Sequence, residues 1–255
     1  MRIALGAESP ASTWLQPDLG VPGIRVVSTT RQGGSSAGPY AGLNLGDHVS
    51  DEAAHVEQNR AILEAFLPSE RTITWLKQVH GTRVLNAASE YTRSIEADAI
   101  WTDNKAFACT VMTADCLPIV LADIHGRCIA AVHGGWRGLA SHILRETIEA
   151  LPVAPEELVA WLGPAIGPTV FEVGGDVLAA FYLAETDAAV RLVPDTEDKY
   201  LLDLNMIAGR QLLALGLRAD NISGGEICTF SNPDRFFSHR RDGVTGRMAT
   251  AIYFE

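Results

Sequence analysis

Short apolar runs separated by polar turns recur along the chain and predict a protein rich in β-strands. The most apolar block covers residues 107–133 and divides into expected strands at 107–113, 119–124 and 128–133. His125-Gly126-Arg127 predicts a tight hairpin between the last two. Because these runs are almost continuously apolar, their strands should be central and covered on both faces. Other strands are expected at 24–28, 72–76, 82–85, 99–102, 158–162, 226–230 and 247–254.

Segments with helical spacing lie between some of these strands. An acidic first turn at 50–52 opens a helix that Pro68 ends. Further helices are expected at 139–151, 175–184 and 203–215. Strands and helices do not alternate strictly, and no GxGxxG follows a strand, which argues against a Rossmann fold. The expected fold class is α/β (α+β), a layered sandwich around a mixed β-sheet, with residues 1–255 forming a single domain.

Charge and composition narrow the range of partners. The 255 residues include 20 Lys and Arg against 31 Asp and Glu, a net charge of −11. Nucleic-acid binding needs a basic face, so we expect no nucleic acid and no membrane as partner. No apolar run has the length of a signal peptide core or a membrane span. The four cysteines form no CxxC pair, which favours a cytoplasmic protein with reduced thiols. Both a monomer and a small homo-oligomer remain open.

Three residues in apolar surroundings carry the candidate chemistry: His80, Cys116 and His133. One thiolate and two imidazoles with an open fourth position match a catalytic zinc site. Their spacing is not itself a known zinc pattern, and a residue of this kind taken singly is more often a core or turn residue. Asp98 and Asp115 are candidates to orient a ligating histidine through a hydrogen bond.

A second group of residues predicts anion binding. The glycine loop at 134–138 joins an expected strand to an expected helix, so its backbone N–H groups can hold an anion. Arg137 would add a bidentate phosphate clamp. The segment 236–241 places Arg240 and a second arginine beside two phenylalanines. It predicts either a site for base stacking and anion contact or a solvated basic turn. Arg60, on the first expected helix, is a further anion contact or a surface residue.

Several motifs in order resemble those of one family. They are NLGDHV at 44–49, KQVHG at 77–81, TADCLP at 113–118, HGGWRG at 133–138, WLGPAIG at 161–167, and FFS with Arg240 at 236–240. Over residues 25–254 the chain resembles the polyphenol oxidase or laccase-domain family, also called purine nucleoside phosphorylase, with some members called peptidoglycan editing factor. One departure is Gly134, where the family usually has alanine.

The resemblance implies a compact sandwich with a mixed sheet and a zinc site made of His80, Cys116 and His133. It also implies a purine nucleoside pocket beside the metal. The family's activities are phosphorolysis of adenosine, inosine and methylthioadenosine, together with adenosine deamination. Substrate or phosphate contacts are then expected from Asn44, Arg60, Arg137 and Arg240.

Copper is the alternative metal. Two histidines and one cysteine also form blue-copper sites, and Met112 is close to Cys116 in the sequence as an axial ligand. A multicopper centre should need more histidines than the seven present, typically in close pairs, and no His-x-His occurs. Zinc is therefore expected, and a multicopper laccase is disfavoured. The chain also lacks the His-x-Glu and Cys-x-x-Cys pattern of zinc deaminases, so any adenosine deamination would have to use a different arrangement of residues.

Two other functions use the same residues. In a cysteine hydrolase, Cys116 would attack an amide in a cell-wall peptide precursor. His133 or His80 would then act as the base, oriented by Asp98 or Asp115. In a non-catalytic binding module the zinc would be structural, but such sites usually have four protein ligands and only three are evident here.

Overall fold

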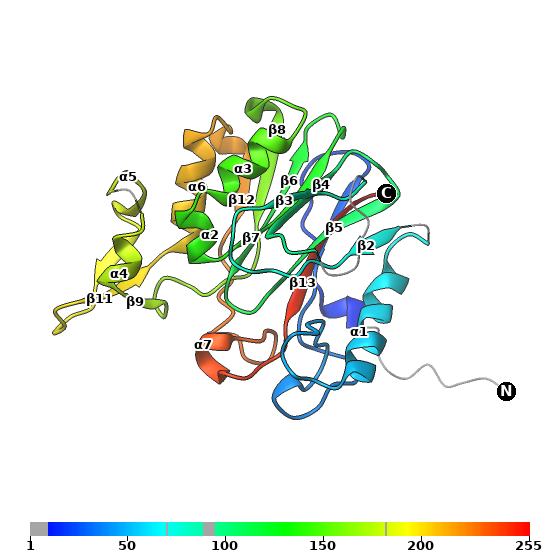
Figure 1. Cartoon of the computed structure of the whole chain (residues 1–255), viewed down its shortest axis with the longest axis horizontal. Coiled ribbons are helices and arrows are strands. Elements are labelled where there is room, and N and C mark those ends of the chain that lie inside the picture. The colour runs from blue at the N-terminus through cyan, green and yellow to red at the C-terminus, as the bar shows by residue number, and fades with distance from the viewer. Residues whose placement is uncertain (1–9, 70, 89–94, 182) are drawn as a thin grey trace.

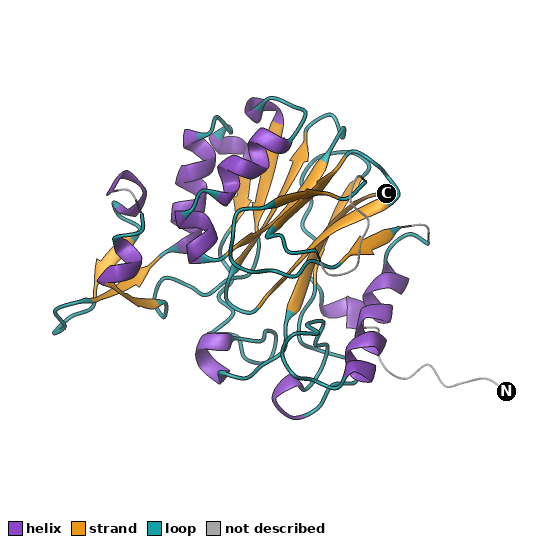
Figure 2. Ribbon diagram, in the orientation of Figure 1, coloured by secondary structure: helices purple, strands orange, loops and turns teal. Residues whose placement is uncertain are grey.

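Two mixed β-sheets that face each other form the centre of the protein, as Figures 1 and 2 show. This computed structural model describes residues 10–69, 71–88, 95–181 and 183–255. Among these residues, no helix combines the length and the apolar character that crossing a bilayer requires. The expected α/β sandwich with mixed sheets is confirmed, with two large sheets where one was expected.

The two large sheets differ in size and strand order. The four-stranded sheet has the order β1 (Ile24–Ser28), β13 (Met248–Phe254), β5 (Phe107–Thr113), β2 (Thr72–Thr74). The six-stranded sheet has the order β12 (Ile222–Gly224), β8 (Leu158–Leu162), β6 (Leu117–Asp123), β7 (Ile129–Gly134), β4 (Ala99–Thr102), β3 (Val84–Asn86). Three strand pairs are parallel, β2–β5, β3–β4 and β8–β12, and the others are antiparallel.

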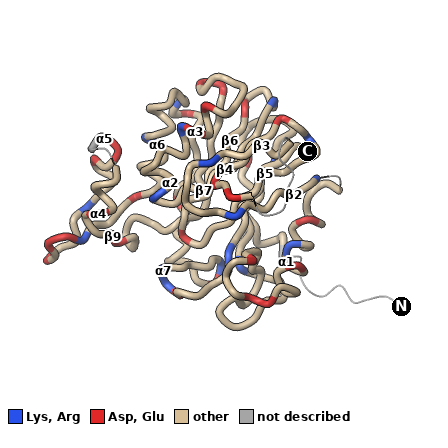
Figure 3. Tube along the Cα trace, in the orientation of Figure 1, with Lys and Arg blue, Asp and Glu red and all other residues tan. Residues whose placement is uncertain are grey.

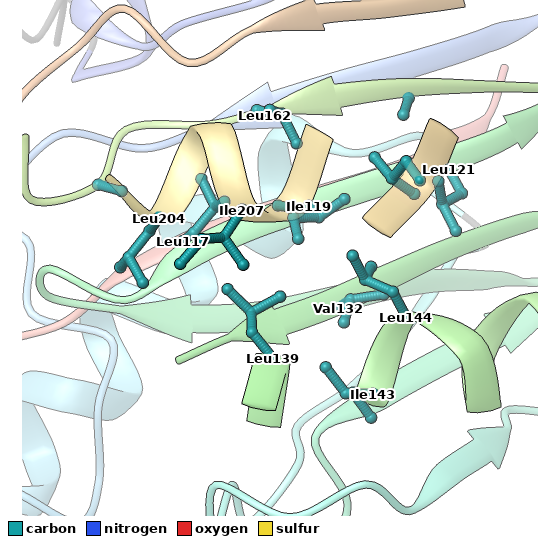
Figure 4. Packing of buried hydrophobic residues seen from close by; sticks show 14 of the residues in the cluster. Leu117, Ile119, Leu121, Val132, Leu139, Ile143, Leu144, Leu162, Leu204 and Ile207 are labelled. Carbon is teal, nitrogen blue, oxygen red and sulfur yellow. The ribbon is translucent and has the colours of Figure 1, made fainter. Parts of the chain in front are cut away.

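Strand β6 shows why the central runs are apolar throughout. Side chains alternate between the two faces of a strand. Ile119 and Leu121 pack against the helices that cover the larger sheet, whereas Val120 and Ala122 face the other sheet. Figure 4 shows part of this helix-facing layer, in which Ile119 belongs to the same buried cluster as Leu144 and Ile207 of the covering helices. Every residue of β6 is therefore buried.

Helices cover the outer faces of both sheets. The larger sheet packs against α2 (Trp136–Ala140), α3 (Ile143–Ala150) and α6 (Leu204–Ala214). The smaller sheet packs against α1 (Ala53–Phe66), whose Leu63 is fully buried. Short 3₁₀ segments lie at Pro10–Thr13, Gly38–Tyr40, Pro155–Glu157 and Ala219–Asn221.

A small antiparallel sheet projects from the body as an arm, at the left of Figure 1. Its order is β10 (Val190–Leu192), β11 (Lys199–Leu202), β9 (Glu172–Gly174), and it carries the short helices α4 (Gly175–Leu178) and α5 (Leu183–Thr186). Figure 3 shows acidic residues at the far tip of this arm. The last short helix, α7 (His239–Asp242), lies on the main body.

Several local expectations are wrong. The helix expected at 139–151 is divided because His142 has a φ of +64°, a left-handed conformation that interrupts helical hydrogen bonding. The segment 175–184 contains α4 and only the start of α5. Residues 226–230 form no strand. Cys228 makes only an isolated bridge to Ala165, and the strand paired with β8 lies a few residues earlier.

Candidate active site

The sheet geometry brings Cys116 and His133 to the same end of the larger sheet. Strands β6 and β7 are antiparallel, and Pro118 pairs with His133 in their register. Cys116 immediately precedes β6, so it lies beside the end of β7 that carries His133. His80 reaches the same point from the loop before β3, where its φ is +60°. Three segments distant in sequence therefore converge.

Asp98, directly before β4, connects the two histidines. Its Oδ1 accepts hydrogen bonds from His133 Nδ1 at 2.8 Å and from the backbone N–H of His80 at 2.9 Å. Its Oδ2 accepts from the backbone N–H of Gly81 at 2.7 Å and of Val79 at 3.2 Å. The carboxylate is fully buried. It therefore fixes the His80 loop and the orientation of the His133 ring together.

The distances among the three candidate ligands suit a single metal ion. One ligand atom from each of His80, Cys116 and His133 lies within 4.8 Å of the others. Cys116 Sγ is 3.8 Å from His80 Nε2. Tetrahedral zinc with ordinary bond lengths separates a sulfur and a nitrogen ligand by about 3.5 Å. Because His133 Nδ1 bonds to Asp98, its Nε2 is left for the ion, a frequent carboxylate–histidine–metal arrangement.

The electrostatics of the group also favour metal binding. Burial alone would raise the pKa of the Cys116 thiol, but His133 and His80 lower this pKa to about 6. Burial opposes protonation of His133, yet Cys116 and Asp98 outweigh burial and raise the pKa of His133 to about 9. The thiolate is thus the stable form of Cys116 at neutral pH, and thiolate is the form that binds metals.

Two further polar residues hold the surrounding loops. The Gln78 amide donates to Met112 O and accepts from Met112 N, both at 2.7 Å, which ties the His80 loop to β5. Asp115 has a φ of +90° at the point where the chain leaves one sheet for the other. Its carboxylate accepts from the hydroxyls of Thr229 and Ser238 and from the backbone N–H of Arg240.

A cavity of about 400 Å³ opens over the three candidate ligands. One part of its wall is apolar and includes Ile166, Phe171 and Leu204. The polar part includes Gln78 and three arginines, with two histidines beside them: His48, Arg137, His239, Arg240 and Arg247. The cavity therefore presents an apolar surface, a candidate metal site and several cationic groups to one ligand.

The sequence-predicted residues fall into two groups. One group lines the cavity and consists of His80, Cys116, His133, Arg137, Arg240 and Asp115. The carboxylate of Asp115 bonds to Thr229, Ser238 and Arg240, and not to His80 or His133, contrary to expectation. Asp98 is the carboxylate that bonds to His133 and to the His80 backbone. The glycine loop leads into helix α2. This helix has only five residues and is too short to provide a strong dipole for the anion site expected there.

Asn44 and Arg60 do not line the cavity. Asn44 is fully buried, donates to Gly46 O and Asp51, and accepts from the backbone N–H of Gly46 and Arg247. Arg60 bonds to Leu45 O, pairs with Asp47 at 3.3 Å and covers the Trp75 ring.

Sequence reasoning missed several residues of the wall, among them Gln78, His48, Phe171, Leu204 and Arg247. Gln78 and His48 lie within motifs that carried the resemblance, so those motifs contained a usable signal. Phe171 and Leu204 look like ordinary apolar core positions. Arg247 precedes an apolar strand and resembles a surface residue at a strand end.

Two glycines allow the close approach of these segments. A Cβ at Gly135 would lie 2.9 Å from His80 Cδ2 and 3.2 Å from Cys116 Sγ. A Cβ at Gly134 would lie 2.8 Å from Leu117 O. Glycine at this position therefore allows β7 to approach the start of β6 this closely.

Comparison with known proteins shows which family and which proteins the chain is similar to. Residues 25–255 match the family model described as multi-copper polyphenol oxidoreductase laccase. A Haemophilus influenzae protein named purine nucleoside phosphorylase is 43% identical, over 94% of this chain and 99% of that protein. The Escherichia coli purine nucleoside phosphorylase YfiH is 44% identical, over 94% of this chain and 96% of that protein.

Solved structures share the fold of this chain. A crystal structure from Neisseria meningitidis has a TM-score of 0.90 at 42% identity, covering 95% of this chain and 99% of that one. YlmD from Geobacillus stearothermophilus has a TM-score of 0.83 at 31% identity, covering 95% and 96%.

Substituting Gly135 by alanine tests the ligand geometry. The added methyl group would press on His80 and Cys116, so we expect zinc affinity to fall by about 10- to 100-fold, as when other changes displace metal ligands. Competition titration with a zinc chelator measures the affinity. Gly209→Ala, in helix α6 with open space around it, is the matched control and should bind zinc like the wild type. Equal affinities in both variants would contradict the geometry.

Proposed function

We propose that this chain, which belongs to the family described as multi-copper polyphenol oxidoreductase laccase, is a metal-dependent purine nucleoside phosphorylase. The relatives named purine nucleoside phosphorylase, similar over nearly their whole length, support this activity. The substrates proposed are adenosine, inosine and methylthioadenosine, with adenosine deamination as a side activity and the cytoplasm as the place of action.

The observation that carries this proposal is the convergence of His80, Cys116 and His133 within a cavity that also has an apolar wall and basic groups. These three residues would hold the metal, and their two nitrogens and one sulfur suit zinc, with copper as the alternative. A bound divalent ion supplies a concentrated positive charge beside the substrate. Among the described residues, His80, Cys116 and His133 form the one group of three or more His, Cys, Asp or Glu side chains that could hold a metal ion. Three ligands are too few for a multicopper centre.

The chain's own residues would bind and orient the two substrates. Phe171, Ile166 and Leu204 offer a surface for the purine ring. Phosphorolysis forms a bond between a phosphate oxygen and C1′ of the ribose and breaks the bond from C1′ to the base, which leaves with a proton. Arg137 and Arg240, exposed at the cavity rim, would attract the phosphate. Holding both reactants in one site would lower the barrier through proximity and orientation, and the nearby positive charges would add electrostatic stabilisation.

A second candidate, a cysteine hydrolase, is favoured by one specific contact. Asp98 Oδ1 accepts from His133 Nδ1 at 2.8 Å, and the other side of that ring faces Cys116. In cysteine enzymes, a carboxylate similarly orients a histidine base, and the base activates the thiol nucleophile. The substrate would be an amide in a cell-wall peptide precursor.

The assay that tests the phosphorylase uses purified, zinc-loaded protein with inosine or adenosine and phosphate. We expect release of hypoxanthine or adenine together with ribose 1-phosphate, measured by chromatography, only when phosphate is present. Cys116→Ala should abolish turnover, because it removes a metal ligand, while the thermal unfolding transition remains cooperative. Absence of base release by the zinc-loaded wild type would contradict the proposal.

Alkylation of the thiol separates the two candidates. In the phosphorylase, one equivalent of zinc should protect Cys116 from iodoacetamide, and protection and turnover should disappear together on chelation. In the hydrolase, metal-free protein should retain activity and lose it when Cys116 is alkylated. Mass spectrometry of the peptide that contains Cys116 gives the extent of modification, with the buried thiol of Cys109 as an internal control.

A further inference from the structure

Arg247 reaches the cavity from a rigidly held backbone. Its backbone N–H donates to Asn44 Oδ1 at 2.8 Å, and its carbonyl accepts from the N–H of Leu45 at 3.0 Å. Asn44 is fully buried. A Cβ at Gly46 would lie only 2.7 Å from Arg247 Cγ, so glycine there makes room for the arginine. The segment 44–46 therefore serves to place Arg247.

Arg247 differs from Arg60, Arg127 and Arg241 in that no described carboxylate pairs with its charge. Arg60, Arg127 and Arg241 each pair with an aspartate. Within the described part of the chain, no carboxylate lies at ion-pair distance from Arg247. Its Nη1 donates to the backbone oxygens of Thr245 and Gly246, at 2.9 and 3.0 Å, and its Nε and Nη2 donate to no described protein group.

Partial burial makes this arrangement costly without an anion. Burial lowers the pKa of Arg247, partly opposed by Cys116, Asp115 and Tyr40. A guanidinium with five N–H donors that is withdrawn from water needs acceptors for them. Arg247 lines the same cavity as Cys116 and His80, and Asp115 is the one acidic residue among the described residues of that wall. Asp115 is already bonded to Thr229, Ser238 and Arg240.

The other arginines of the cavity are placed differently. Arg137 is exposed and stacks on the Trp136 ring at 4.3 Å. Arg240 is exposed, donates to Glu172 O at 2.6 Å and lies over the Phe171 ring at 5.0 Å. Both lie at the rim, and Arg240 also joins α7 to the arm. Arg247 is the half-buried cation of the three.

We propose that Arg247 binds the phosphate substrate inside the cavity, beside the His80–Cys116–His133 group, and that Asn44 and Gly46 position it. The inference rests on the proposed phosphorolysis for the identity of the anion. A guanidinium can present two parallel N–H donors to two phosphate oxygens, which would orient phosphate as well as hold it. Arg137 and Arg240 then attract the anion at the entrance.

Binding of inorganic phosphate to the zinc-loaded full chain tests this inference without requiring turnover. We expect Arg247→Gln to raise the Kd for phosphate by about 10- to 100-fold, the range for loss of charged hydrogen bonds. Titration followed by phosphorus NMR measures the Kd. Arg247→Lys keeps the charge and loses the paired donors, so its Kd for phosphate should lie between those of the wild type and Arg247→Gln. This second variant keeps the test valid if the glutamine variant fails to fold.

The matched control is Arg71→Gln. Arg71 also donates to two backbone oxygens, those of Phe254 and Glu255, but lies outside the cavity wall. The Arg71→Gln substitution should leave the Kd for phosphate within about twofold of the wild type, since distant sites act independently. Zinc content and thermal midpoint are compared in every variant.

The outcomes separate this inference from the proposed function. Wild-type phosphate binding that Arg247→Gln and Arg247→Lys leave unchanged would overturn the role of Arg247, even if the protein releases purine bases. Absence of phosphate binding by the wild type would overturn it as well. Loss of phosphate binding in the Arg247 variants would support the anion site even if no nucleoside is cleaved. Where turnover is present, the KM for phosphate should rise far more than the KM for inosine.

Discussion

The buried carboxylate of Asp98 is the contact on which the candidate site depends. It accepts from the His133 ring and from three consecutive backbone N–H groups at Val79, His80 and Gly81. Burial raises the pKa of this carboxyl, and the hydrogen bond from His133 with those from Gly81 and His80 outweighs burial, so its pKa is lowered overall. An ionised carboxylate is stable in the interior only when it is paired in this way. The charge of Asp98 thus holds a loop and a strand together at one point.

The sandwich architecture explains where that point lies. The chain passes from the smaller sheet to the larger one between β5 and β6, through the left-handed residue Asp115. Cys116 follows at once and is partly buried at the sheet end, where it still lines the cavity. Asp115 also binds the segment at 238–240, so the residue that turns the chain attaches the opposite wall of the cavity. Fold and site are built by the same few contacts.

Local patterns were sufficient for much of this structure. The strand at 24–28 and the strand at 158–162 have the expected bounds, because a short apolar run bounded by turn residues specifies a strand. The division into two sheets was not predictable, since runs buried on both faces look alike whether a helix or a second sheet covers them. The break at His142 was also hidden, because no glycine or proline signals it.

The candidate site was predictable in its ligands and less so in its surroundings. His80, Cys116 and His133 belong to distinct motifs, and the structure brings all three together with Asp98. The roles of Asn44 and Arg60 depend on long-range contacts that no local pattern contains. Asn44 bonds to a residue 203 positions away, and Arg60 stacks on Trp75. Arg247 stands out because it bonds to backbone oxygens and, within the described residues, to no carboxylate, which only coordinates can reveal.

X-ray absorption at the zinc edge of the zinc-loaded protein tests the central claim most directly, because it reports the atoms bound to the ion. The expected spectrum contains one sulfur at about 2.3 Å and nitrogen or oxygen neighbours at about 2.0–2.1 Å, with the multiple scattering of two imidazoles. Cys116→Ala should remove the sulfur contribution. A wild-type spectrum without sulfur, or with the sulfur unchanged in Cys116→Ala, would show that these three side chains do not share one ion.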